Sequence, residues 1–134
     1  MSPHQIVELM IKKDSFSQFL NIEVVKASLG FSVLKLHVHE GLLNGFNIAH
    51  GGVSFALADS CLAFAANSYG YKAVSLESSI SHLKKVCLND TLLVTSEEIR
   101  KGKSIGVYQV KVENQFLELV AHFKGTVHFL PDMW

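Results

Sequence analysis

The feature that most constrains the fold is a mostly apolar segment, VSFALADSCLAFAANS, at residues 53–68. It is rich in Ala and Leu, contains no Pro, and is followed by Gly70, a residue typical of the position just after a helix. The segment therefore predicts one helix of about 18 residues that begins at Gly51. Its apolar side chains cover several faces, so the helix cannot lie on the surface with one solvated side.

Segments on both sides of this helix alternate between apolar and polar residues, which is typical of strands. An N-terminal amphipathic helix and a short turn of helix or loop, SFSQFLN, come first, and residues 40–50 form a loop. Short polar connections between consecutive strands indicate antiparallel pairing. The predicted strands cover residues 21–28, 31–39, 73–83, 91–100, 104–113 and 116–130.

A sheet is the only partner large enough to enclose the apolar helix. The sequence therefore predicts an α+β architecture in which a curved antiparallel sheet of five to six strands wraps one long helix. This arrangement is that of the hotdog fold. The length of 134 residues suits one domain over residues 1–134.

Composition excludes several classes of function. Twelve Lys and Arg balance twelve Asp and Glu without a basic patch, so we expect no nucleic-acid partner. Cys61 and Cys87 lack the spacing of a disulfide framework or zinc site, which favours a reducing cytoplasm. The apolar segment is shorter than the roughly 20 residues of a membrane span and contains Asp59, and the N-terminus lacks a signal-peptide core. We expect a cytoplasmic protein without a membrane contact.

A polar cluster leads directly into the helix and resembles a known motif. The pattern N-G-x4-H-G-G-x2-F-x-L-A-D, followed by N-S-x-G, resembles the phenylacetic-acid degradation type of hotdog thioesterase, and FKGTVHF at residues 123–129 resembles the last strand of that family. The resemblance implies hydrolysis of acyl-coenzyme A thioesters by a homo-oligomer, with active sites between subunits and no metal or redox cofactor. The motif residues are Asn44, Gly45, His50, Gly51, Gly52, Phe55, Leu57, Ala58, Asp59, Asn67, Ser68 and Gly70.

The residues of this motif suit that chemistry. Hydrolysis of a thioester needs hydrogen-bond donors for the developing oxyanion and a carboxylate that activates water or attacks directly. Gly51 begins the helix, where backbone N–H groups are unpaired and the dipole is positive, so its amide can hold the carbonyl oxygen. Asn44 and His50 lie in the preceding loop, where each could donate to the thioester, orient water or brace the loop.

Asp59 supplies the carboxylate, and its apolar neighbours on the helix should raise its pKa. Gly51 and Asp59 are eight positions apart. At about 1.5 Å per residue, their backbones are therefore separated by roughly 12 Å along one helix. One chain cannot bring both to the same carbonyl group. A two-fold homodimer with antiparallel helices could pair Gly51 of one chain with Asp59 of the other, and hotdog dimers commonly pair again into tetramers.

The strand after the helix supplies further candidates. The resemblance implies a polar residue there that helps to position water, for which Ser75 is the best counterpart and Ser78 the second. Lys84 and Lys85 stand where that family often has Arg-Pro. They could contact the phosphates of coenzyme A, although lysines at a strand end are commonly only solvated.

Other interpretations stay open at this point. Asp59 could be structural, and His50 could only brace its loop. The chain could bind acyl-coenzyme A without turnover, or could be a hydratase or dehydratase, although the motifs of the latter are missing. His37 and His39 share a strand face, but no third ligand is suitably spaced, so we expect no metal site. Phenylacetyl, hydroxybenzoyl and medium-chain acyl groups all remain candidate substrates.

Overall fold

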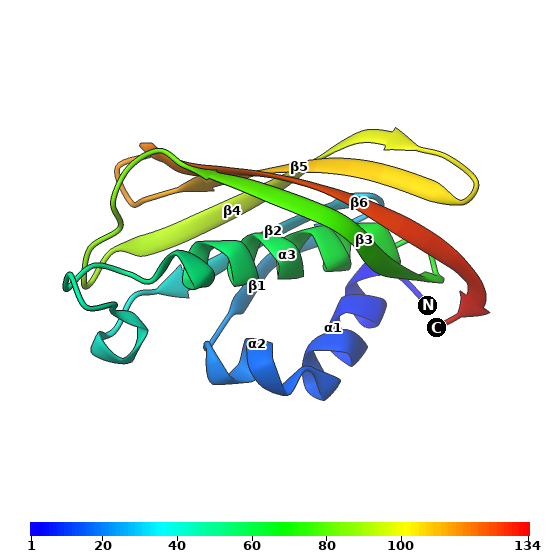
Figure 1. The fold of residues 1–134 in the computed structure, drawn as a ribbon. Coiled ribbons are helices and arrows are strands. Elements are labelled where there is room, and N and C mark those ends of the chain that lie inside the picture. Colours follow the sequence, from blue (N-terminus) through cyan, green and yellow to red (C-terminus); the bar gives the residue numbers. More distant parts are fainter.

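The computed structural model describes residues 1–134. Two short helices precede the first strands, and a longer helix separates β2 from β3 (Figure 1). The elements are α1 (Pro3–Lys13), α2 (Ser15–Phe19), β1 (Glu23–Ser28), β2 (Phe31–His37), the 3-10 turn η1 (Glu40–Leu42), α3 (Gly51–Asn67), β3 (Tyr71–His82), β4 (Thr91–Lys101), β5 (Ile105–Glu113) and β6 (Leu119–Met133).

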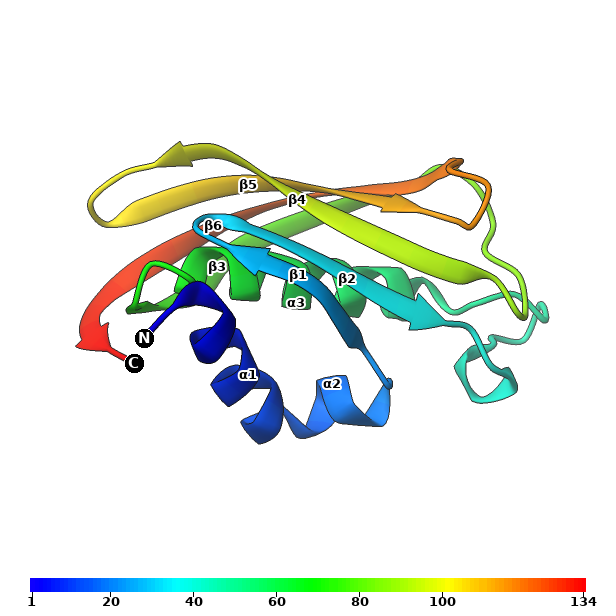
Figure 2. The same ribbon diagram turned by 180° about the vertical axis from the view of Figure 1, so that it is seen from behind.

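The six strands form one antiparallel sheet in the order β1-β2-β4-β5-β6-β3. The sheet curves over one side of α3, and α1 and α2 lie on the other side (Figures 1 and 2). The predicted α+β hotdog architecture, with one long helix against an antiparallel sheet, is confirmed. β1 and β3 are the two edge strands, so each has one side without a strand neighbour.

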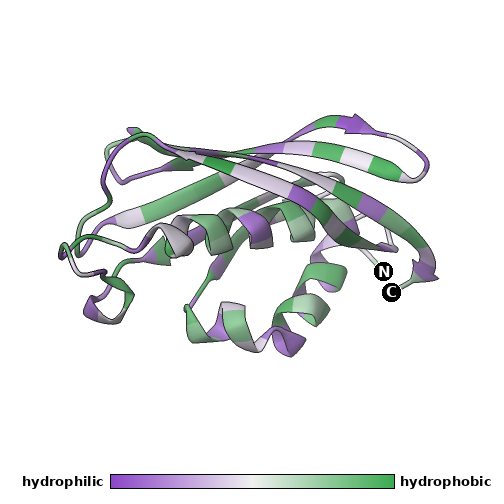
Figure 3. Ribbon diagram, viewed as in Figure 1, coloured by the Kyte–Doolittle hydropathy of each residue, from purple (hydrophilic) through white to green (hydrophobic).

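The core lies between α3 and the sheet. Leu57, Cys61 and Leu62 of α3 are fully buried and belong to the main apolar cluster, together with Phe123 of β6. Figure 3 shows the apolar colouring along much of α3 and in alternating bands along the strands. The sheet is not the only cover of the helix, because α1 also packs against it. Phe55 of α3 remains 37% exposed.

The last strand begins later than predicted, at Leu119 instead of residue 116. The side-chain oxygen of Asn114 accepts hydrogen bonds from the backbone N–H groups of Phe116 and Glu118, at 3.0 and 3.1 Å. These amides are therefore used in a turn and cannot join a strand ladder. Leu117 has a positive φ of 60°, which also ends any extended conformation there. The strand continues to Met133, three residues beyond the predicted end.

A bulge in β3 changes which residues face the helix. Ser75 pairs with Val127 and Glu77 with Thr126, so Leu76 is an extra residue on β3. Ala73 before the bulge and Ile80 after it both pack against the core. Since residues two apart on a strand share a face, Ser75 and Ser78 both lie on the side of the sheet that faces α3. The bulge thus explains why a simple alternation could not choose between them.

The turn between β1 and β2 gives a test of the fold. Gly30 has a φ of +68°, and a methyl group on it would collide with the Glu98 carboxylate and lie 2.5 Å from the Tyr69 hydroxyl oxygen. That carboxylate also accepts hydrogen bonds from Tyr69 and Tyr108. We expect Gly30→Ala to lower the free energy of unfolding by about 1–3 kcal/mol in urea denaturation.

Gly45→Ala is the matched control, because a methyl group there meets nothing within 4 Å. Its free energy of unfolding should stay within about 0.5 kcal/mol of the wild type. Equal stability of the Gly30 and Gly45 variants would contradict the role given to the Gly30 turn.

Candidate active site

Asn44 organises the loop that leads into α3. Its Oδ1 accepts hydrogen bonds from the backbone N–H groups of Phe46 and Ile48, at 2.9 and 3.4 Å. With the oxygen used in this way, Nδ2 is the free end of the amide, and it has no hydrogen-bond partner within the chain. Asn44 therefore braces the loop with one atom and keeps a donor available with the other.

His50 caps the first turn of α3. Its Nδ1 accepts a hydrogen bond from the Gly52 N–H at 2.8 Å. The backbone N–H of His50 donates to Leu42, and the N–H of Ala49 donates to Val86 in the loop after β3, at 2.9 and 2.8 Å. The start of the helix is thus fixed to two neighbouring loops. Of the predicted roles for His50, bracing is the one that its contacts show.

Gly51 is left with a free donor. Its backbone N–H has no hydrogen-bond partner within the chain, whereas the next two N–H groups are bonded to His50. Gly51 lines a cavity of about 340 Å³ that lies between the start of α3 and the loop after β3. The polar side of this cavity also contains Asn44, Ser54, His82, Lys84 and Lys85. His50 lines a separate cavity, on the side of α2.

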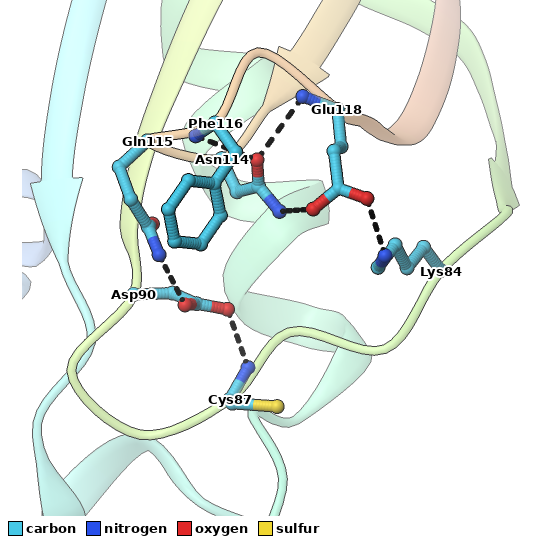
Figure 4. Close-up of polar contacts among 7 residues, drawn as sticks. All are labelled: Lys84, Cys87, Asp90, Asn114, Gln115, Phe116 and Glu118. Atoms are coloured by element: carbon cyan, nitrogen blue, oxygen red, sulfur yellow. Dashed lines mark hydrogen bonds and ion pairs between the residues drawn. The ribbon is translucent and has the colours of Figure 1, made fainter.

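The two lysines of this cavity differ in their contacts. The Lys84 ammonium group pairs with the Glu118 carboxylate, which also accepts a hydrogen bond from Asn114 Nδ2 at 3.0 Å (Figure 4). The hydrogen bond and the opposite charge raise the pKa of Lys84, and the same contact lowers the pKa of Glu118. Lys85 has no ion pair. Of these two lysines, only Lys85 therefore carries a charge that no carboxylate of the chain pairs with.

The loop that carries the lysines is anchored by a second set of contacts. Asp90 accepts hydrogen bonds from the backbone N–H of Cys87 and from the side-chain amide of Gln115, at 2.8 and 2.9 Å (Figure 4). Gln115 belongs to the turn between β5 and β6, as Asn114 does. The wall of the cavity is thus tied to that turn at two points.

Asp59 lies in the middle of α3 and is only partly exposed. Burial raises the pKa of its carboxyl group, and a hydrogen bond from the Ser75 hydroxyl, at 3.4 Å, partly offsets this. Ser78 lies on the same face of β3 but makes no hydrogen bond to Asp59. The structure therefore pairs Asp59 with the first of the two predicted serines.

The predicted residues do not all come together within one chain. Asn44, Gly51, Lys84 and Lys85 share one cavity, and Asp59 does not line it. Gly51 and Asp59 both belong to the single continuous helix α3, eight positions apart.

His82 and Ser54, which complete the polar wall of the cavity, were not among the predicted site residues. His82 could have been proposed from its position two residues after Ile80, because residues two apart on a strand share a face. The contact of His82 with Gly51 at the start of α3 could not be predicted, because no local sequence pattern indicates it.

Two further observations concern metals and membranes. No group of three or more His, Cys, Asp or Glu side chains is placed to hold a metal ion. None of the helices has both the length and the apolar character needed to cross a bilayer.

Comparison with known proteins identifies the family. The family model of the Thioesterase superfamily matches residues 46–121. The chain is also 36% identical, over 124 residues, to acyl-coenzyme A thioesterase PaaI of Escherichia coli K12; the alignment covers 92% of this chain and 89% of that protein. The chain belongs to the thioesterase superfamily.

Solved structures of the superfamily agree with this assignment. The PaaI protein of the E. coli phenylacetic acid degradation operon superimposes with a TM-score of 0.95 at 34% identity, covering 98% of this chain and 95% of that one. A hypothetical thioesterase of Streptococcus pneumoniae TIGR4, determined with coenzyme A, gives a TM-score of 0.87 at 30% identity, covering 94% and 98%.

The raised pKa of Asp59 predicts a cost to stability. A carboxyl group whose pKa is higher in the folded than in the unfolded chain destabilises the fold when ionised, and this cost disappears when the pH falls below both values. We expect Asp59→Asn to stabilise the fold at neutral pH, by on the order of 1 kcal/mol, and to match the wild type only near about pH 3, below the pKa of the unfolded carboxyl group. Thermal melts over a pH series measure this difference.

Asp132→Asn is the control, because Asp132 is exposed. It should show no such pH-dependent gain. A variant Asp59→Asn that is less stable than the wild type at neutral pH would show that the carboxylate stabilises the fold.

Proposed function

We propose that this protein hydrolyses acyl-coenzyme A thioesters to a free acid and coenzyme A, with an aryl-acetyl, aromatic or medium-chain acyl group. The observation that carries the proposal is the unpaired N–H of Gly51, a residue that lines the same cavity as Lys84 and Lys85. The E. coli relative is an acyl-coenzyme A thioesterase, and the S. pneumoniae structure contains coenzyme A.

In this proposal, the start of α3 stabilises the developing oxyanion. The thioester carbonyl oxygen accepts a hydrogen bond from the Gly51 N–H, at the positive end of the helix dipole. The free Nδ2 of Asn44 lies on the same cavity and can donate to the substrate. His50 acts indirectly, because its bond to Gly52 holds the helix start in place. These donors are fixed before the substrate arrives, so little reorganisation is needed during the reaction.

Asp59 provides the other half of the chemistry. As a general base, it takes a proton from a water molecule that attacks the carbonyl carbon; as a nucleophile, it would attack that carbon itself. In both cases the carbon–sulfur bond breaks and the electron pair leaves with the sulfur of coenzyme A. The raised pKa makes this carboxylate a stronger base, and the Ser75 hydroxyl can orient it or the water. The proposed reaction uses no metal or redox cofactor.

A homodimer would bring the two halves together. β3 is an edge strand, and its Val74 and Leu76 side chains are 47% and 58% exposed. An unpaired edge with exposed apolar side chains suits pairing with a second copy. Two-fold pairing with antiparallel α3 helices places Gly51 of one chain opposite Asp59 of its partner, which gives two equivalent sites. We infer that such dimers pair again into tetramers.

Coenzyme A carries phosphates that need positive partners. Lys85 is free for this contact, whereas Lys84 is paired with Glu118 and can only share its charge. We therefore propose Lys85 as the principal phosphate contact and Lys84 as a secondary one. Ser78 lies on the face of β3 that is turned to α3, makes no hydrogen bond to Asp59, and is proposed as a secondary substrate contact.

We also infer that residues 1–134 act as one thioesterase domain in the cytoplasm. Four of the strands and α3 contribute buried residues to one apolar cluster, and β1 and β3 pack partly buried side chains against it. Both cysteines are free thiols, as a reducing compartment would keep them.

A panel of acyl-coenzyme A substrates tests the proposed function. Release of free thiol is expected for at least one of phenylacetyl-, hydroxybenzoyl- and medium-chain acyl-coenzyme A. Asp59→Ala should reduce kcat at least about 100-fold, since removing the base or nucleophile removes the chemical step. Tight binding without thiol release would instead indicate a non-catalytic acyl-coenzyme A binding module, and alkene formation a hydratase.

Mixed dimers test whether the site is shared. Asp59→Ala and Gly51→Val are each expected to be inactive alone, because the valine side chain would push against His82 and block the Gly51 amide. In a refolded equimolar mixture, half of the dimers are mixed, and each has one intact site, so about a quarter of the wild-type activity should return. Activity that stays at the level of the separate variants would contradict the shared site.

A further inference from the structure

His82 lies against the residue that supplies the proposed oxyanion donor. A methyl group built on Gly51 would come within 3.1 Å of His82 Nε2 and 3.2 Å of its Cε1. The imidazole edge therefore packs over the Gly51 Cα, at the end of β3, where the strand passes the start of α3. Both residues line the same cavity. A side chain at residue 51 would push the imidazole away by at least a few tenths of an ångström, so the glycine permits this close approach.

The imidazole has no structural partner that would explain its position. Neither ring nitrogen of His82 makes a hydrogen bond or ion pair within the chain, and the side chain is exposed. This differs from His50 and His39, whose Nδ1 atoms accept bonds from backbone N–H groups. His82 thus keeps an N–H donor free in either neutral tautomer.

The surroundings favour negative charge on a ligand atom at this point. Lys84 and Lys85 follow His82 closely in the chain and border the cavity, and the Ser54 hydroxyl lies one turn along α3 from Gly51. No carboxylate lines this cavity, since Asp59 lies elsewhere and Glu118 is held by Lys84. Within its own chain, an oxygen bound to the Gly51 N–H would therefore meet donors and positive charges, and the carboxylate that acts on the thioester would come from Asp59 of the second copy.

We propose that His82 is a further catalytic residue, whose imidazole N–H donates a second hydrogen bond to the thioester carbonyl oxygen beside the Gly51 N–H. This inference rests on the proposed hydrolase function. As the attacking oxygen bonds to the carbonyl carbon, the π electrons move onto the carbonyl oxygen, and two donors share the new charge. The proton stays on the His82 imidazole throughout, because the oxyanion does not need to be protonated before the sulfur leaves.

Kinetics of two His82 variants test the proposal. His82→Phe keeps a planar ring against Gly51 but has no donor, and we expect kcat to fall about 10- to 100-fold with KM within about threefold of the wild type. His82→Gln keeps an N–H donor and should retain more of kcat than the Phe variant. His37→Phe, on an exposed histidine of β2 outside the cavity, is the matched control and should leave both constants unchanged.

A spectroscopic measurement separates hydrogen bonding from packing. Asp59→Asn should bind a carbonyl-13C-labelled acyl-coenzyme A with slow turnover, and hydrogen bonds at the carbonyl oxygen lower its stretching frequency. In Asp59→Asn combined with His82→Phe, the isotope-edited infrared band should move to higher frequency. A His82→Phe enzyme with kcat within threefold of the wild type, or an unchanged band, would overturn the proposal. Absence of thiol release from every substrate by the wild type would instead refute the proposed function.

Discussion

Burial of α3 is the constraint on which the rest of the structure depends. The helix has apolar side chains on several faces, and only a curved sheet can cover most of them at once. That requirement brings the end of β3 and the following loop to the start of the helix, where Ala49 bonds to Val86. The cavity at Gly51 forms at this junction. The oxyanion donor and the lysines are therefore neighbours because of the packing of α3.

The elements with strong periodicity could be predicted from sequence. The start of α3 at Gly51 and the number of strands follow from local patterns of apolar residues, which a single chain segment carries by itself. The bulge at Leu76 could not be predicted, because it depends on how β3 pairs with β6. The predicted start of β6 was wrong because the Asn114 side chain accepts hydrogen bonds from backbone N–H groups that a strand would use in its ladder.

The residues of the candidate site also differ in whether they could be predicted from local sequence. Asn44, His50, Gly51 and Asp59 belong to one short motif, so their chemistry could be proposed from the order of residues alone. The ion pair of Lys84 with Glu118, 34 residues apart, and the contact of His82 with Gly51, 31 apart, depend on strand register and helix packing.

Asp59 shows how function and stability oppose each other in this helix. An aspartate among apolar neighbours is held at a raised pKa, and one serine hydroxyl is its only hydrogen-bond donor. A more completely bonded carboxylate would be a more stable residue and a weaker base. The exposure of Phe55 on the same helix shows that this part of α3 is not fully covered by its own chain. A second copy that covers it would bury Asp59 further and raise its pKa again.

The two adjacent glycines have different uses. A methyl group on Gly52 would come within 2.9 Å of His50 Nδ1, so Gly52 lets the capping imidazole reach its own N–H. A methyl group on Gly51 would instead press on His82, on the opposite side of the helix start. The second N–H of the helix is thus bonded to the capping imidazole, whereas the first has no partner in the chain and stays free for a ligand. In the His-Gly-Gly sequence, one helical N–H is thus capped by the histidine and the other is left open, and a side chain at either glycine would press on an imidazole.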